Sequence, residues 1–177
     1  VYNNEKQVGR AIKDSGIART SIWITSKVPH TVTTYDEAIR YFDQTLADLD
    51  TSYVDLYLVH WPVTKPLQES GDNYYARNRE IWRAMEDIYR SGRAKAIGVS
   101  NFSIDDINNI LEVANVKPMV NQIKYHIGHH PDDIVKFCKK HDIVVEGYSS
   151  LGRGAVLQSE AVKMLGQKYN ATPAQMA

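Results

Sequence analysis

Two kinds of apolar pattern alternate along the chain, and this alternation leaves few folds open. Short runs rich in β-branched and aromatic residues predict strands, and most of them are apolar on both faces, as in covered sheets. Segments with apolar residues at three- and four-residue spacing lie between them and predict helices. The predicted strands are Ser21–Ser26, Val54–His60, Ala94–Val99, Met119–Ile123 and Ile143–Tyr148. The predicted helices are Asn4–Lys13, Tyr35–Leu49, Asn78–Arg90, Ser103–Val113, Pro131–Lys140 and Ser159–Tyr169.

Helix start and stop signals agree with these segments. Thr34 and Ser103 each stand three residues before a carboxylate, which is the spacing of a capping box. Gly92 follows a predicted helix as a stop signal, and Thr172, with a proline next to it, predicts the start of a further helix. Strands that alternate with helices predict a parallel α/β sheet, and we expect one domain over residues 1–177.

Composition excludes several classes of function. The chain has 21 Lys and Arg residues against 21 Asp and Glu, so the formal charge is zero, which argues against a nucleic-acid or anionic lipid partner. No apolar run approaches the ~20 residues of a membrane helix. The single cysteine, Cys138, excludes an internal disulfide and favours a reducing, cytoplasmic location. We expect it to be a structural thiol.

Polar residues stand at the carboxyl end of every predicted strand. They are Lys27, His60, Ser100, Gln122 and Tyr148. In parallel α/β folds, ligands bind at this edge of the sheet. Each residue also has a structural interpretation: a solvated lysine, a buried histidine, a helix cap, a strand amide and a core tyrosine. Their joint occurrence favours a lined pocket.

Several segments, in order along nearly the whole chain, resemble the aldo-keto reductases. They are VYNNE at 1–5, ITSK at 24–27, DLYLVHWP at 55–62, IGVSNF at 97–102, VNQ at 120–122 and GYSSLGRG at 147–154. The resemblance implies a TIM (β/α)8 barrel and an NADP-dependent oxidoreductase. Such a barrel takes about 250 residues, so we expect an incomplete barrel of about five βα units. We also expect the 177 residues to be part of a larger chain, unstable and inactive alone.

The resemblance also implies a catalytic set of Asp, Tyr, Lys and His. Tyr2 matches the tyrosine that donates the proton, Lys27 the lysine and His60 the histidine. A phenol keeps its proton at neutral pH, and a nearby ammonium makes it a better acid. His60 can hydrogen-bond and orient the substrate oxygen. The aspartate that would pair with the lysine has no matching residue, because Asp55 and the other aspartates stand elsewhere.

Further matches concern the cofactor. Ser100, Asn101 and Gln122 match residues that hold the nicotinamide carboxamide, which suits groups that both donate and accept. Tyr148 matches an aromatic residue that stacks on the nicotinamide ring. The loop 149–153, with Ser149 and Leu151, matches a segment near the pyrophosphate, although such a loop is also simply a good turn. The family implies NADP, and NAD stays open.

Other residues keep more than one interpretation. Trp61 is expected to line the substrate pocket or to have a structural role. The segment 72–78 is expected to be part of a loop over the pocket. His126, His129 and His130 lie close together in sequence, but their spacing favours a polar loop, and we predict no metal site.

Three functions therefore compete. The first is NADPH-dependent reduction of a small aldehyde or ketone by a protein that is monomeric at full length. The second is a non-catalytic, cofactor-binding relative such as a channel-associated subunit. The third is an aldolase that forms a Schiff base on Lys27, a chemistry open to a lysine at a barrel strand end. The segments around Lys27 and His60 favour the reductase.

Overall fold

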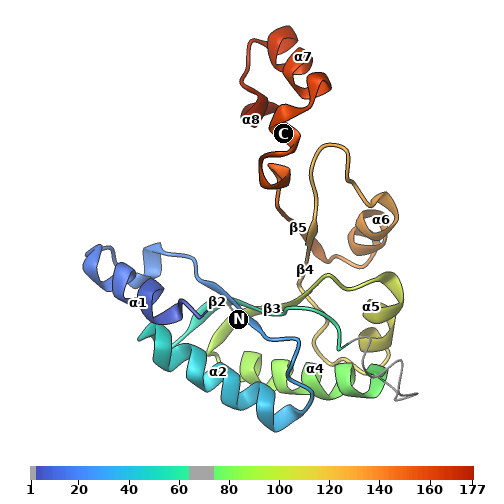
Figure 1. Cartoon of the computed structure of the whole chain (residues 1–177). Coiled ribbons are helices and arrows are strands. Elements are labelled where there is room, and N and C mark those ends of the chain that lie inside the picture. Colours follow the sequence, from blue (N-terminus) through green and yellow to red (C-terminus); the bar gives the residue numbers. More distant parts are fainter. Residues whose placement is uncertain (1–2, 64–73) are drawn as a thin grey trace. The chain divides into compact units, whose positions relative to one another are not determined.

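The computed structural model describes residues 3–63 and 74–177 (Figure 1). In chain order, the elements of the first part are α1 (Glu5–Asp14), η1 (Arg19–Ser21), β1 (Thr25–Val28), α2 (Tyr35–Leu49), β2 (Val54–Val59), α4 (Tyr74–Arg90), β3 (Ala94–Ser100) and α5 (Ile104–Leu111). The remaining elements are β4 (Val120–Lys124), α6 (Asp132–Lys140), β5 (Val144–Tyr148), η2 (Gly152–Gly154), η3 (Val156–Gln158), α7 (Glu160–Tyr169) and α8 (Pro173–Met176). The sheet has the strand order β1-β2-β3-β4-β5, and β1, β2 and β3 pair in parallel. The predicted alternation and parallel sheet are confirmed.

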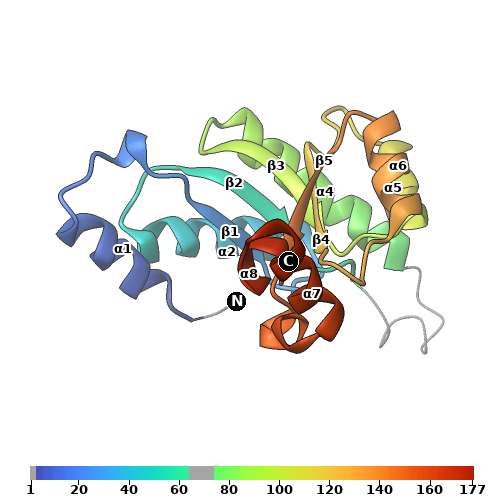
Figure 2. The same cartoon turned by 90° about the horizontal axis from the view of Figure 1, so that it is seen from above.

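The chain divides into two compact units, Val1–Asn121 and Gln122–Ala177. In the first unit, α2 and α4 pack together along one face of β1, β2 and β3, and α1 packs against α2 (Figure 2). That face is the helix side of the sheet. The opposite face of the same strands carries the residues discussed below.

The helix α2 shows why this layer forms. The Thr34 hydroxyl accepts a hydrogen bond from the Glu37 backbone N–H and starts the helix, as the sequence predicts. Phe42 is fully buried and meets the ring of Tyr57 in β2 edge-on, with 4.7 Å between ring centroids. Burial of one such aromatic side chain contributes about 2–3 kcal/mol. The apolar residues of α2, at three- and four-residue spacing, thus form the face of the helix that is buried against the sheet.

The first strand was predicted too early in the chain. The prediction began at Ser21, whereas β1 is Thr25–Val28. The Arg19 guanidinium binds Asp55 at 2.8 Å and the carbonyl oxygen of Ile22 at 2.6 Å, while Asp55 also accepts the Ile24 N–H at 2.8 Å. Side chains therefore hydrogen-bond the Ile22 carbonyl oxygen and the Ile24 N–H, two backbone groups that a strand would use for pairing.

The predicted loop 72–78 is also wrong in part. Residues 74–78 lie in α4, which begins at Tyr74, four residues earlier than the predicted Asn78. Residues 72 and 73 lie outside the described part of the chain. The buried Asn78 side chain accepts the Val63 N–H at 2.8 Å, so it ties the residues directly after β2 to α4.

In the second unit, α6 packs on β5 and α7 packs on α8. Cys138 of α6 is fully buried, in line with a structural thiol. Thr172 starts α8 with a complete capping box, as predicted. Val144 of β5 is 63% exposed, so this strand is not covered on both faces in the described chain. Among the helices that the structure describes, none has the length and apolar character needed to cross a bilayer.

Candidate active site

The register of the first three strands places three predicted site residues on one face. Lys27 lies level with Leu58, and Leu58 lies level with Gly98. His60 and Ser100 follow two residues further along β2 and β3, and side chains two positions apart in a strand point to the same face. The His60 N–H donates to the Val28 carbonyl oxygen at 3.1 Å, so pairing continues to this residue. Lys27, His60 and Ser100 thus share a face at the carboxyl ends of adjacent strands.

The imidazole of His60 is half-buried beside positive charge. Burial lowers its pKa below the usual 6.5, and the charges of Lys27 and His30 lower the pKa further. The ring is therefore neutral at pH 7 and offers one donor and one acceptor nitrogen. A neutral imidazole next to an ammonium suits a hydrogen bond to an uncharged carbonyl oxygen.

Asn101 connects the ends of β2 and β3. Its backbone is left-handed, with φ 61°, a conformation that asparagine tolerates better than most residues. Its amide nitrogen donates to the His60 carbonyl oxygen and to Ser100 Oγ, both at 3.0 Å. Asn121, which is fully buried and was not among the predicted site residues, donates to the Phe102 carbonyl oxygen at 3.1 Å. The turn after β3 is thereby held from two sides.

Of two further predicted site residues, Trp61 and Tyr2, the structure describes only Trp61. Trp61 is 43% exposed, and its ring centroid lies 6.4 Å from that of His60. This placement leaves the indole accessible beside the imidazole. Tyr2 lies outside the described residues, so its role stays a prediction.

The second unit holds the other predicted cofactor residues. Gln122 is 8% exposed, and its amide nitrogen donates to the Glu146 carboxylate at 2.7 Å. Tyr148 ends β5 half-buried, and its carbonyl oxygen accepts the Tyr125 N–H at 3.2 Å. Leu151 is 42% exposed in the following loop.

A cavity of about 490 Å³ lies beside Tyr148. Three basic residues and no acidic residue line it; the full lining is Lys124, His126, Tyr148, Ser149, Gly152, Arg153, Ala155 and Val156. Lys124 and His126 were missed from the sequence. The signal was present, because they follow Gln122 at intervals of two, the period of a strand face. A cationic lining of this kind suits an anionic ligand.

The loop after β5 has an unusual backbone. Four of its residues have positive φ: Ser149 at 55°, Gly152 at 56°, Arg153 at 54° and Gly154 at 91°. Two of its N–H groups are used inside the loop, from Gly152 to the Ser149 carbonyl oxygen and from Gly154 to that of Leu151. The turn is therefore internally braced beside the cavity.

The histidine-rich segment forms a tight turn. His126 and His129 exchange backbone hydrogen bonds of 3.0 and 2.8 Å, and Gly128 between them has φ 82°. Within residues 3–63 and 74–177, no group of three or more His, Cys, Asp or Glu side chains could hold a metal ion.

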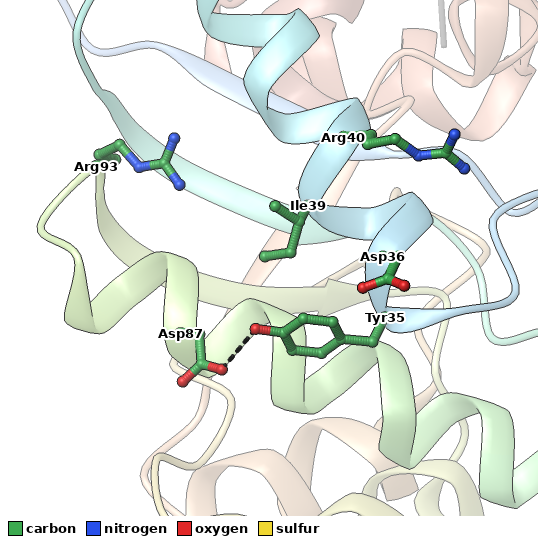
Figure 3. A pocket seen from close by; sticks show the side chains of 6 residues that line it. All are labelled: Tyr35, Asp36, Ile39, Arg40, Asp87 and Arg93. Atoms are coloured by element: carbon green, nitrogen blue, oxygen red, sulfur yellow. Dashed lines mark hydrogen bonds between the residues drawn. The ribbon is translucent and has the colours of Figure 1, made fainter.

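A second hollow, of about 780 Å³, lies on the outer side of the first unit. Residues of α2 and α4, with Arg93, line it, and the Tyr35 hydroxyl donates to Asp87 across it at 2.8 Å (Figure 3). Burial adds to that hydrogen bond in raising the pKa of Tyr35. None of the predicted site residues is among its lining.

The fold and these residues correspond to one family of oxidoreductases. The model of the Aldo/keto reductase family matches residues 1–175, and the chain belongs to this family. It is similar to the glyoxal reductase of Bacillus subtilis, with 37% identity over 176 residues, which are 99% of this chain and 60% of that protein. It is also similar to an aldehyde reductase of Saccharomyces cerevisiae, with 38% identity over 197 residues, covering 99% of this chain and 62% of that protein.

Solved structures agree with this assignment. An aldo/keto reductase from Brucella melitensis superposes with a TM-score of 0.88 at 36% identity, over 99% of this chain and 64% of that one. A point mutant of Gox0644, solved in complex with NADPH, superposes with a TM-score of 0.85 at 34% identity, over 98% of this chain and 59% of that one. The predicted family and fold class are confirmed. The chain spans about 60% of the length of the curated relatives named above.

Proposed function

We propose that this chain carries the catalytic and nicotinamide-binding residues of an NAD(P)H-dependent reductase that converts aldehydes or ketones to alcohols. The observation that carries the proposal is the strand register, which puts Lys27, His60 and Ser100 on one face at the carboxyl ends of adjacent strands. The relatives support it, since they include a glyoxal reductase, an aldehyde reductase and an NADPH-dependent alpha-keto amide reductase.

The residues of the second unit fit a nicotinamide dinucleotide. Tyr148 and Ser149 line a cavity in which Lys124 and Arg153 can neutralise phosphate charge. We propose that Tyr148 stacks on the nicotinamide ring, that Ser100, Asn101 and Gln122 hold its carboxamide, and that Ser149 and Leu151 belong to the loop nearest the phosphates. We expect NADP to be the cofactor. NAD is the alternative, and a comparison of the affinities for NADPH and NADH decides between the two.

We propose that residues of the protein supply the proton and orient the substrate oxygen. A bound reduced nicotinamide supplies the hydride. Tyr2 donates a proton to the carbonyl oxygen, and the ammonium of Lys27 makes that phenol more acidic. His60, neutral because of burial and nearby charge, donates a hydrogen bond that orients the same oxygen. Trp61 offers an exposed indole as a wall for the substrate.

The setting of the reaction follows from the same residues. We propose a cytoplasmic protein, since the one cysteine in the sequence is buried in α6, and a monomer that acts on small carbonyl compounds. We also propose that the 177 residues alone have little activity, because strand residues such as Val144 stay exposed.

The test uses a protein that carries these residues at the length of its relatives. Loss of reduced-nicotinamide absorbance is followed with a reactive aldehyde such as a nitrobenzaldehyde. Lys27→Met is expected to lower kcat by about 10²-fold or more, with NADPH affinity unchanged. Lys95→Met, a change of an exposed lysine near the start of β3, should leave kcat unchanged.

A second measurement separates cofactor binding from chemistry. Tyr148→Ala should weaken NADPH binding by about three- to tenfold, the size of a lost aromatic contact, and Tyr148→Phe should retain it. NADPH binding without turnover of any carbonyl compound would favour the non-catalytic alternative. A protein that neither binds NADPH nor turns over an aldehyde contradicts the proposal.

A further inference from the structure

One hydrogen bond joins the side-chain amide of Gln122 to a carboxylate on the neighbouring strand. Gln122 Nε2 in β4 donates to Glu146 Oε1 in β5 at 2.7 Å. Gln122 is buried, and a buried side-chain amide needs hydrogen-bond partners. The two residues are 24 positions apart and lie in the same compact unit, so the contact depends on the pairing of β4 with β5.

The bond lies on the face of the two strands that carries the basic cavity. Side chains two positions apart in a strand share a face, so Lys124 lies on the face of Gln122, and Tyr148 lies on the face of Glu146. Lys124 and Tyr148 both line the cavity of about 490 Å³. The Gln122–Glu146 pair is therefore next to the residues proposed to hold the cofactor, one step back along each strand.

The backbone around this pair is closely packed. The Tyr125 N–H donates to the Tyr148 carbonyl oxygen at 3.2 Å, which joins the two strands at this level. Gly147, between Glu146 and Tyr148, faces the other way, and a Cβ added there would lie 3.2 Å from Tyr125 Cβ. This close approach on the other face keeps Glu146 and Tyr148 on the face of the cavity.

The carboxylate decides which way the amide of Gln122 is turned. A carboxylate accepts hydrogen bonds and donates none, so the NH2 end of the amide must face Glu146. The amide oxygen then points away from Glu146. An amide oxygen has two lone pairs, so it can accept from a ligand in addition to its contacts within the chain.

We infer that Glu146 is a positioning residue: it holds Gln122 with the amide oxygen toward the cofactor, where that oxygen accepts a hydrogen bond from the NH2 group of the nicotinamide carboxamide. The inference rests on the proposed function, because it takes Gln122 as a ligand of the carboxamide. An amide turned the other way would set two NH2 groups against each other and lose this bond. Glu146 thereby makes the site prefer a carboxamide to a group that has the carbonyl oxygen alone.

The experiment compares the binding of two cofactors to the protein at the length of its relatives. One is NADPH, and the other is its analogue with an acetyl group in place of the carboxamide, which keeps the carbonyl oxygen and lacks the NH2 group. Dissociation constants are measured by quenching of tryptophan fluorescence. The parent should bind NADPH about tenfold more tightly than the analogue, the effect of one lost hydrogen bond.

The main variant keeps the length of the side chain and removes its acceptor-only character. In Glu146→Gln the partner both donates and accepts, so the amide of Gln122 can turn either way, and the preference for NADPH should fall below about threefold. The affinity for the analogue should stay nearly unchanged. Glu160→Gln removes an exposed carboxylate from the same unit; it is the matched control and should keep the tenfold preference.

The ratio of the two affinities separates positioning from a general structural loss, which weakens the binding of both cofactors alike. Gln122→Ala should abolish the preference. Glu146→Gln added to Gln122→Ala should leave the ratio unchanged, because no amide is then present to be oriented. Glu146→Met has a similar length and no acceptor oxygen; it should give the same low ratio and decides the question if Glu146→Gln does not fold.

The outcomes distinguish the positioning role from the proposed function. A parent that reduces aldehydes with NADPH, and whose preference Glu146→Gln and Glu146→Met leave intact, overturns the positioning role alone. A parent that binds NADPH and its analogue equally, or a Glu146→Gln variant that loses both in proportion, also overturns that role alone. A parent that neither binds NADPH nor reduces a carbonyl compound overturns both. A ratio that falls in Glu146→Gln and stays in Glu160→Gln supports both.

Discussion

Gly98 offers a sharp test of how closely the strands approach at the site. It lies level with Leu58 and Lys27, and its φ is not in the left-handed region, so an alanine there meets no backbone strain. A Cβ at this position would lie 2.4 Å from the Val120 carbonyl oxygen and 2.9 Å from Leu58 Cδ2. Contact with the carbonyl is about 1 Å shorter than the 3.4 Å at which ordinary contact begins.

The main-chain carbonyl cannot rotate away as a side chain can, so Gly98→Ala must displace backbone. Overpacking costs about 1–3 kcal/mol, and we expect the upper end, about 3 kcal/mol. The hydrogen bond from the Met119 N–H to the Ile97 carbonyl oxygen, 2.9 Å long, lies beside the clash and should weaken with it. At about 2–4 °C for each kcal/mol, the melting temperature should fall by about 6–12 °C.

The assay is urea unfolding of the protein at the length of its relatives, followed by tryptophan fluorescence, to which the buried Trp82 contributes, with a thermal melt alongside. Gly147→Ala is the matched control: its Cβ would lie 3.2 Å from Tyr125 Cβ, a contact that a shift of a few tenths of an ångström relieves. We expect that control to lose under about 1 kcal/mol. A Gly98→Ala variant as stable as the control would refute the close approach of the neighbouring strand.

Three further predictions concern single residues. Glu86→Ala should cost about 3 kcal/mol in urea unfolding, because two backbone N–H groups after α5 lose an acceptor at 2.6 and 2.7 Å; the half-exposed Asp87→Ala should cost under about 1 kcal/mol. The pKa of His60, followed by NMR, should lie below its usual 6.5 and rise in Lys27→Met, because the lysine charge is removed. Since the unfolded state binds this proton first, the free energy of unfolding should decline as the pH falls below 6.5, and a stability that rises with acidity there would contradict the lowered pKa. Asn101→Ala should lower the free energy of unfolding in urea by about 1–2 kcal/mol, because it removes two hydrogen bonds and strains a left-handed backbone. Asn101→Gly should lower it less, because glycine adopts that backbone without strain.

Much of the site could be placed from sequence, because strand-end residues in a parallel sheet meet at one edge. Lys27, His60 and Ser100 follow from that rule alone. Lys124 and His126 were missed because the segment that carried the resemblance was taken only as far as Gln122, although these two residues follow Gln122 at intervals of two. The start of β1 was wrong because Asp55 and Arg19, distant in sequence, take over backbone hydrogen bonds that a local pattern cannot show.

By itself, the sequence determined the alternation of strands and helices, the helix caps and the family, since these depend on local spacing and on motifs such as the one around His60. The tertiary structure alone decided which side chains act on one another. The lowered pKa of His60 requires burial and the charge of Lys27, which is 33 residues earlier in the chain. A hydrogen bond between Glu5 and Ser26 joins residues 21 positions apart, and it forms because α1, which packs on α2, brings Glu5 beside β1. Electrostatic and packing energies fall off with distance in space, and only the folded chain sets those distances.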